Sequence, residues 1–246
     1  MVKKILPQLS FLFVFLLGWE IATRTLGVSH LILPPPSHVM KVLIERNNYL
    51  LQQSAITCLA SILGFVLGGI VATIIAVIFL SWEITRAAVY PYIIMFKAVP
   101  LIALAPLIVT WFGTNLLSEV ILAAIVSFFP ILVGIIDGVK QVTEQELDIF
   151  TVYSATKWQK LSILGWYTAL PSIFAGMKVS ISFAVLGAIL TEGISSDSGI
   201  GHLIRGSNYY LDTDLMFAGV VHATIIGLFL FWTIELLSNK IVFWNK

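Results

Sequence analysis

The sequence has few charged residues and a single cysteine. Only 11% of its 246 residues are charged, whereas 59% are hydrophobic. A soluble domain carries about 25% charged residues, so most of this surface must face something other than water. With a single cysteine, the chain cannot form an internal disulfide. Cys58 lies within an apolar run, so we expect it to be a small buried hydrophobic residue. The net charge of +1 gives no indication of a nucleic-acid partner.

The sequence also lacks several motifs that mark enzymes and nucleotide-binding proteins. It has no His-Glu-x-x-His pair and no Gly-x-Ser-x-Gly turn, which argues against a hydrolase embedded in the membrane. It has no Gly-x-x-x-x-Gly-Lys-[Ser/Thr] loop, so we expect any ATP and Mg²⁺ to be bound by a partner. We find no internal repeat of the kind that many secondary transporters carry. We therefore expect no catalytic, cofactor or metal site, and we keep enzyme and secondary transporter as the alternatives.

Long apolar runs dominate the chain, and its mean hydropathy is +0.98. A bilayer core about 30 Å thick needs roughly 20 residues of helix. The runs are apolar on all faces, unlike the alternating strands of a membrane barrel. The sequence thus predicts an all-α integral membrane protein with about six spans, which lie approximately at 6–26, 56–80, 89–112, 120–139, 164–191 and 215–237.

The first apolar run has two interpretations. Lys3 and Lys4 precede Leu9–Gly18, as in a signal peptide. However, no small-x-small cleavage site follows, and Trp19 and Glu20 continue the segment. We expect a retained first span rather than a removed leader.

Lysines and arginines predict the orientation. With a cytoplasmic amino terminus, eight of those outside the spans lie on the inner side and four on the outer side, which favours two cytoplasmic termini. The inner ones are Lys3, Lys4, Arg86, Lys140, Lys157, Lys160, Lys240 and Lys246, and the outer ones are Arg24, Lys41, Arg46 and Arg205.

The connecting segments predict some local structure. In the outer segment Ser29–Gln53, prolines 34–36 block helix, and Ser37 is expected to cap a short amphipathic helix. Glu192–Asp214 is expected to be an outer loop. We expect one domain over residues 1–246, with a membrane core over about 52–238.

The inner segment Gln141–Ile163 has an acidic first half, and lysines follow the small residues Ser154–Thr156. Two short helices meeting at these small residues would place acids and bases favourably for both helix dipoles. Small residues at a bend also permit close approach by another protein. The residues alone leave two interpretations open, a docking site or an ordinary solvated loop.

This inner segment resembles the cytoplasmic coupling motif of binding-protein-dependent ABC importer permeases. That motif reads Glu-Ala-Ala, three residues, Gly, nine residues, Ile-x-Leu-Pro. Asp148 takes the position of the glutamate, Ile149 and Phe150 take those of the alanines, and Ser154 takes that of the glycine. Trp166-Tyr167 stands where Leu-Pro is expected.

Further stretches resemble, in the same order, the permeases of nitrate, sulfonate, taurine, thiamine-pyrimidine and riboflavin importers. The resemblance covers nearly the whole chain. The stretches are Leu33-Pro34-Pro35-Pro36-Ser37, Ala98-Val99-Pro100, Ala105-Pro106-Leu107, Trp111-Phe112-Gly113, Phe128-Phe129-Pro130, Ala169-Leu170-Pro171, Glu192 and Ser198-Gly199-Ile200-Gly201.

The resemblance implies a type I importer fold in the cell inner membrane. It implies two permease copies, a cytoplasmic ABC ATPase dimer that holds ATP and Mg²⁺, and an extracytoplasmic solute-binding protein. It also implies that residues 141–163 contact the ATPase. The bulkier residues at the alanine and glycine positions imply a partner-specific groove or weaker coupling. The implied coupling residues are Glu146, Asp148, Ile149, Ser154, Ala155 and Thr156.

Ionisable groups and prolines within spans give candidates for a pathway or gate. Lys97 and Pro100 lie in a proline-rich span, and Glu192 closes the fifth span. The plainer alternatives are snorkelling or ion pairing for Lys97 and an interfacial carboxylate for Glu192. We expect Lys178 to anchor at the interface and His222 to bond a neighbouring helix.

Two stretches bear on the substrate. Phe128-Phe129-Pro130 and Asp137-Gly138-Val139 resemble the pyrimidine and riboflavin permeases more than the sulfonate permeases. A thiamine-pyrimidine precursor or a riboflavin-like compound is therefore the favoured solute, and a sulfonate, taurine or nitrate is the alternative.

Overall fold

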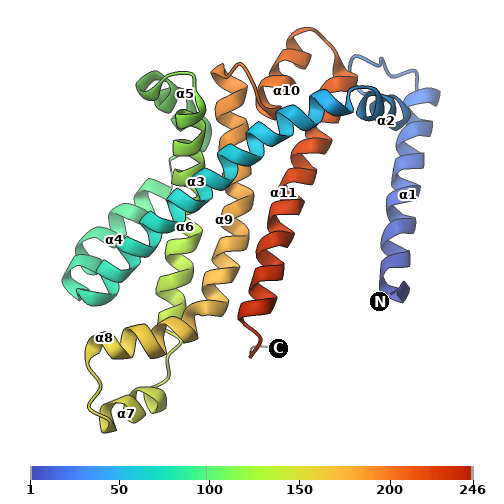
Figure 1. Cartoon of the computed structure of the whole chain (residues 1–246). Helices are drawn as coiled ribbons and strands as arrows, with labels where there is room; N and C mark the ends of the chain where they lie inside the picture. The colour runs from blue at the N-terminus through green and yellow to red at the C-terminus, as the bar shows by residue number, and fades with distance from the viewer. Residues whose placement is uncertain (1, 98, 245–246) are drawn as a thin grey trace.

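The computed structural model describes residues 2–97 and 99–244, which form helices joined by short loops (Figure 1). Four helical segments of this described chain are long and apolar enough to cross a membrane. This confirms the prediction of an all-α membrane protein. The four are α3 (Asn47–Ser81), α6 (Leu116–Val139), α9 (Trp166–Ser195) together with the helical turns that precede it from Lys157, and α11 (Thr213–Ile241).

The other helices are shorter or lie at the ends of the long ones. They are α1 (Val2–Thr25), α2 (Pro36–Glu45), α4 (Glu83–Lys97), α5 (Leu101–Phe112), α7 (Glu144–Val152), α8 (Lys157–Gln159), a π-helical stretch (Lys160–Gly165) and α10 (Ile200–Tyr209).

The expected single span at 89–112 is wrong. α4 ends at Lys97 and α5 begins at Leu101, so two helices replace it. Pro100 stands immediately before α5 in an extended conformation, with ψ of 122°. Proline has no N–H to donate to a preceding turn, and it disfavours helix at the residue before it, Val99. These two effects break the apolar run.

Close packing of glycines holds α3, α6 and α9 together. A Cβ atom added at Gly68 of α3 would lie 2.5 Å from the carbonyl oxygen of Ala124 on α6. A Cβ atom added at Gly138 of α6 would lie 2.8 Å from Ala169 of α9. Small residues let helix backbones approach closely in a membrane, where lipid tails compete with apolar side chains. Gly64, one turn earlier on α3, makes the same close approach to α6.

Polar side chains also join the long helices. The Ser180 hydroxyl of α9 donates to the Ser127 carbonyl of α6 at 2.5 Å. Ser54 of α3 forms a 2.9 Å hydrogen bond with Nδ1 of His222 on α11, as expected for this histidine. Lys178 of α9 forms an ion pair with Glu235 of α11. The carboxylate of a neighbouring helix thus pairs with the charge of Lys178, and its position at the membrane interface stays a prediction.

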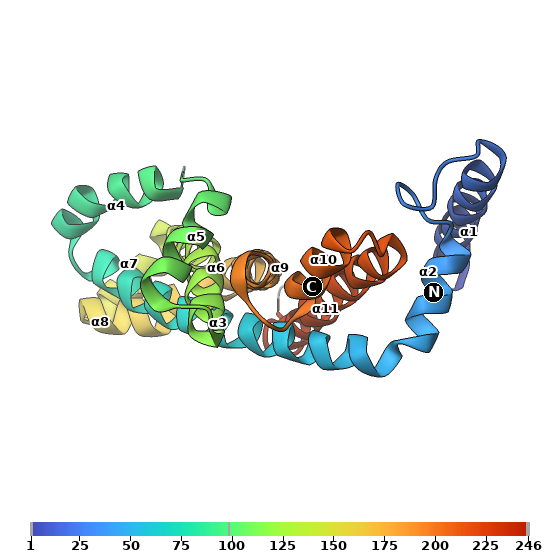
Figure 2. The ribbon, with the colours of Figure 1, turned by 90° about the horizontal axis from the view of Figure 1, so that it is seen from above.

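The helices form an elongated row rather than a closed bundle. α4 lies at one end, α9 near the middle, and α1 with α2 at the other end (Figure 2). α7 and α8 project from one end of the long helices, and both chain termini lie toward that same side (Figure 1). α10 and α2 lie at the opposite side. The coupling segment and the two termini thus share one side of the molecule.

Two expectations about the connecting segments are corrected. Ser37 does not cap α2, because Pro35 occupies the N-cap position and Pro36 the first turn, where proline is well tolerated. Instead, the Ser37 N–H and hydroxyl donate to the Glu20 carboxylate of α1 at 3.0 and 2.8 Å. The outer segment Glu192–Asp214 is not a plain loop, because it contains α10.

Candidate functional site: a coupling segment and a buried helix clamp

The coupling segment, residues 141–163, begins with a reciprocal cap on α7. The Thr143 hydroxyl accepts from the Glu146 N–H at 3.3 Å, and the Glu146 carboxylate accepts from the Thr143 N–H at 2.8 Å. These bonds satisfy N–H groups that have no partner within the helix. Because the cap stabilises the carboxylate, with the backbone bond from Thr143 as the largest cause, the pKa of Glu146 lies below its usual value.

A left-handed residue ends α7. Ser154 has φ of 53°, and its N–H donates to the Thr151 carbonyl at 2.9 Å. The Ala155 N–H donates to the Phe150 carbonyl at 2.9 Å. This pair of bonds is a Schellman motif, which glycine favours at its left-handed position because glycine has no Cβ. The glycine position of the resembled motif therefore coincides with the backbone conformation that favours glycine.

A second reciprocal cap begins the helix that follows. The Thr156 hydroxyl accepts from the Gln159 N–H at 3.2 Å, and the Gln159 side chain accepts from the Thr156 N–H at 2.8 Å. Lys160 then donates to the Thr151 hydroxyl at 2.8 Å, which joins the two short helices across the bend. The predicted pair of helices meeting at Ser154–Thr156 is confirmed, and its geometry is fixed by caps at both sides of the turn.

The tip of the coupling segment exposes apolar side chains. Val152 and Tyr153 are 80% and 82% exposed, Trp158 is 62% exposed, and Ile149 is 57% exposed. Asp148 is exposed beside them. The tip lies beyond the ends of the long helices (Figure 1). Exposed aromatic and aliphatic side chains on a rigid turn are typical of a protein-binding surface.

At the other side of the molecule, Glu192 caps the start of α10. Its side chain is fully buried. One carboxylate oxygen, Oε2, accepts from the Gly201 N–H at 2.8 Å and from the Thr57 hydroxyl of α3 at 2.9 Å. A carboxylate at a helix N-terminus is favoured by the helix dipole. In this arrangement Glu192 cannot touch a passing solute, so any effect on a gate acts through α10.

Two α3 side chains, Thr57 and Gln53, complete this cap. The Thr57 hydroxyl also accepts from the Ile200 N–H at 2.9 Å, and the Gln53 side chain accepts from the Gly199 N–H at 2.6 Å. We call Gln53, Thr57 and Glu192 the α10 clamp. Sequence reasoning missed Gln53 and Thr57, because nothing local relates them to a segment that lies more than 130 positions later in the chain.

A second buried acid lies close to the clamp. Glu119, in α6, is 2% exposed and accepts from the Ser196 hydroxyl at 2.8 Å. Its carboxyl group interacts electrostatically with that of Glu192. Glu119 was missed by sequence reasoning, although an acid in the first turn of an apolar span is a signal for a functional residue.

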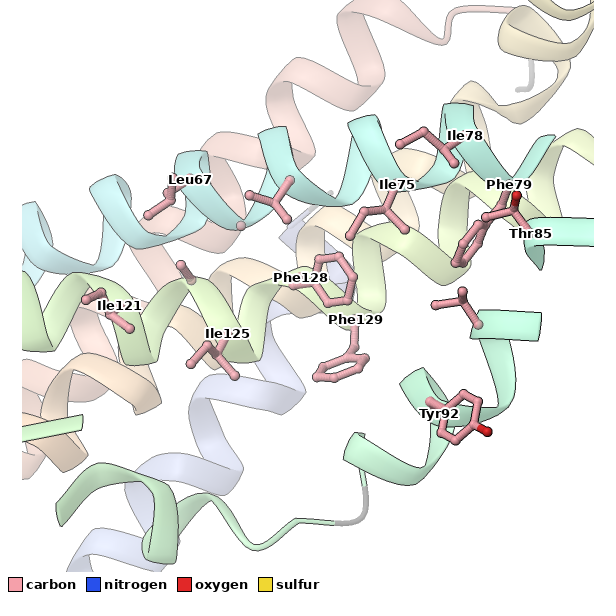
Figure 3. A pocket seen from close by; sticks show the side chains of 14 residues that line it. Leu67, Ile75, Ile78, Phe79, Thr85, Tyr92, Ile121, Ile125, Phe128 and Phe129 are labelled. Carbon is pink, nitrogen blue, oxygen red and sulfur yellow. The ribbon is translucent and has the colours of Figure 1, made fainter. Parts of the chain in front are cut away.

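An apolar cavity of about 700 Å³ lies between α3, α4 and α6 (Figure 3). Phe79, Tyr92, Phe128 and Phe129 supply aromatic rings to its wall. None of the described lining residues is charged. The full lining consists of Leu67, Gly68, Val71, Ile75, Ile78, Phe79, Thr85, Val89, Tyr92, Ile121, Ala124, Ile125, Phe128 and Phe129.

Two sequence candidates lie near the break after α4. Pro100 is exposed at the start of α5. Lys97 ends α4, but its side chain lies outside the described part of the chain. The roles of Lys97 and Pro100 in a pathway or gate therefore stay predictions.

Comparison with known protein families decides the class. The family described as "Binding-protein-dependent transport system inner membrane component" matches residues 64–243. The chain belongs to this family. It is accordingly a multi-pass membrane protein and a permease of the ABC importer type, a class that works in general with an ATPase and a solute-binding protein.

Individual relatives support the same branch that the sequence stretches resemble. Formylaminopyrimidine transport permease protein ThiX of Halalkalibacterium halodurans is 31% identical over 98% of this chain and 96% of its own length. A probable ABC transporter permease protein of Haemophilus influenzae is 27% identical over 97% and 98%. The putative aliphatic sulfonates transport permease protein SsuC of Bacillus subtilis is 27% identical over 93% and 83%.

A solved structure shares the fold. A chain of the MetNI methionine ABC transporter, in an inward-facing conformation, matches with a TM-score of 0.59 at 17% identity. The match covers 82% of this chain and 96% of that chain. The predicted type I importer permease fold is confirmed.

Proposed function

We propose that this permease imports a small solute by docking its coupling segment, residues 141–163, into a groove of a cytoplasmic ABC ATPase. Two permease copies form the pathway, an ATPase dimer binds below them, and an extracytoplasmic binding protein delivers the solute. The family membership supports the general scheme. The coupling residues remain Glu146, Asp148, Ile149, Ser154, Ala155 and Thr156.

The single observation that carries this proposal is the rigid, apolar tip of the coupling segment. The segment connects α6 directly to α9, and these two helices pack closely at Gly138 and Ala169. A displacement of the tip by the ATPase therefore moves the two central helices rather than bending a loose loop. Coupling requires such a contact with two discrete arrangements.

The orientation follows from the same contact. If the tip meets an ATPase, its side is cytoplasmic, and both termini lie toward that side (Figure 1). The excess of lysine and arginine in the same segments agrees with this orientation. The α10 clamp then lies at the outer side, where Glu192 holds α10 against α3 and acts on an outer gate. Lys97 and Pro100 lie at the break between α4 and α5. We assign them to the solute pathway or its gate, because a break in a helix lets the backbone move there.

We propose a thiamine-pyrimidine precursor or a similar uncharged aromatic heterocycle as the solute. The relative that transports formylaminopyrimidine is 31% identical over 96% of its length, against 27% for the sulfonate relative. The cavity beside α4 presents aromatic rings, and its described lining has no cation to receive a sulfonate or nitrate. A sulfonate-type importer is the alternative.

Proteoliposomes test this assignment. They contain the permease, the ATPase that co-purifies with it, and the binding protein from the same transport system. We expect ATP-dependent uptake of labelled formylaminopyrimidine, with little competition from taurine. Taurine uptake at a higher rate than pyrimidine uptake would overturn the solute assignment but leave the importer mechanism standing. Uptake at the full rate without the ATPase would overturn both.

A further inference from the structure

Within the part of the chain that the structure describes, two acids of the long helices lack a basic partner. Neither Glu119 nor Glu192 forms an ion pair with any residue that the structure describes. Oε2 of Glu119 and Oε1 of Glu192 are buried, and neither has a hydrogen-bond partner within the described chain. The two acids flank the same turn, because Glu119 accepts from Ser196, which follows Glu192 at the end of α9. An ionised carboxylate in apolar surroundings is costly unless it is paired and fully hydrogen-bonded.

The basic groups nearby are committed elsewhere. Arg205 of α10 donates to the carbonyl oxygens of Ile194 and Ser196 at 2.5 and 2.9 Å. Nδ1 of His202, also on α10, lies 2.6 Å from the Ser196 carbonyl oxygen. Both side chains therefore hold the turn between α9 and α10 rather than the acids.

The described residues of the other neighbouring helices bring no charge to the pair either. α3 contributes the uncharged Gln53 and Thr57 through the α10 clamp. The sequence of α5 contains no ionisable residue. His222 of α11 is bonded to Ser54. By contrast Glu235, a third acid in the long helices, is paired with Lys178.

Water cannot replace the missing partners on the Glu119 side. The gap beside Glu119 is lined also by Ser118, Thr191 and Ser196, and it has no room for a water molecule. A hydrated metal ion does not fit there either. A proton is the one cation that needs no additional volume, and it converts a carboxylate acceptor into a donor.

We propose that Glu119 and Glu192 form a proton-binding pair, in which one of the two is a neutral carboxylic acid while the turn between α9 and α10 is seated on α6. When this turn leaves α6, water reaches the pair, the O–H bond of the neutral acid breaks, and the proton passes to water.

This pair makes the seated state sensitive to pH. The seated state binds one proton more than the separated state, so separation becomes more favourable as pH rises, by up to about tenfold per pH unit. If α10 belongs to an outer gate, as proposed above, opening of that gate inherits this dependence. That last step rests on the proposed function, whereas the protonation state of the pair does not.

Infrared difference spectroscopy of the purified full-length protein tests the protonation directly. At pH 7 we expect the C=O stretching band of a neutral, buried carboxylic acid, and the double substitution Glu119→Gln with Glu192→Gln removes it. Glu235→Gln is the matched control, because it replaces an acid that is paired with a lysine, and it leaves the band unchanged. Absence of the band in the native protein at pH 7 overturns the proposal, whatever the transport assays show.

Thermal stability separates the proton from a metal ion, and it also reports on folding of the variants. Each single substitution to glutamine mimics the neutral acid, so we expect melting temperatures close to that of the native protein. Glu119→Ala and Glu192→Ala remove hydrogen bonds and lower it. Exchange of Na⁺ for choline at constant ionic strength leaves it unchanged. Stabilisation by Na⁺ that the double glutamine variant lacks would show a metal-ion site and overturn the proposal.

Discussion

Single residues set the geometry of the coupling segment. Thr143 and Glu146 begin α7, and Thr156 and Gln159 begin α8, each pair by reciprocal hydrogen bonds. Ser154 turns the chain between them in a left-handed conformation. Each of these roles depends on short-range chemistry, so a single substitution is expected to change it without disturbing the long helices.

Substitutions at Ser154 test the turn. A left-handed conformation costs an L-residue about 1–2 kcal/mol relative to glycine. We expect Ser154→Gly to retain ATP-dependent uptake and to slow amide hydrogen exchange at Ser154 and Ala155. Ser154→Val places a β-branched side chain at the same φ, so we expect faster exchange and reduced uptake. Equal exchange in the two variants would contradict the assigned backbone role.

Substitutions at Glu146 test the cap of α7. The pKa of Glu146 is lowered in the folded protein, so the cap contributes stability above the ordinary pKa of glutamate and loses it as pH falls through the lowered value. We expect acidification to speed amide exchange in Glu144–Val152, after correction for intrinsic rates. Glu146→Gln keeps the reciprocal cap and should abolish this pH effect, whereas Glu146→Ala should speed exchange at every pH.

Sequence alone predicts those residues whose partners lie nearby in the chain. In residues 141–163, the charge pattern and the small residues predicted two short helices and their meeting point. The pattern consists of an acidic start followed by later lysines. Ser37 shows the limit, since its sequence suggested a cap for its own helix, whereas it donates to Glu20 of α1. A tertiary partner overrode the local pattern.

Among the elements, α3, α6 and α9 form the packed centre, and glycine makes their approach possible. At Gly68 a methyl group would meet the Ala124 carbonyl oxygen at 2.5 Å, whereas at Gly227 of α11 it would meet nothing within 4 Å. We expect Gly68→Ala to destabilise the protein by about 1–3 kcal/mol through overpacking.

Gly227→Ala is the control for that substitution. It adds the same methyl group to a helix without a clash, and alanine favours helix over glycine by about 1 kcal/mol. Its melting temperature in detergent should therefore equal or exceed that of the native protein, while that of Gly68→Ala falls. A similar fall of the melting temperature in both variants would show that packing of α3 against α6 is not the cause.

The elements that sequence reasoning missed share a physical cause. The break between α4 and α5 arises from Pro100, and the continuous apolar run around it conceals this break in the sequence. α10 was expected as a loop because it is short, begins at glycines and takes its caps from distant residues such as Gln53 and Thr57. Propensity and periodicity carry no information about such long-range caps.

At the scale of the whole molecule, composition and the order of motifs predicted the membrane class and the family. The elongated row of helices leaves large apolar faces exposed, as expected for a chain in lipid beside other subunits. The position of Glu192 under α10, close to Glu119, was not predictable. Three separate helices bring these groups together. The central claim at this scale is that energy enters at the coupling segment.

The most direct test of that claim is uptake by proteoliposomes that contain Ser154→Trp permease together with its ATPase and binding protein. An indole at the turn should block seating in the ATPase groove, while Tyr210→Trp, at an exposed position on the opposite side, serves as the control. We predict that Ser154→Trp inserts in the membrane at native levels but gives no ATP-dependent uptake, whereas the control transports normally. Normal uptake by Ser154→Trp would contradict the account.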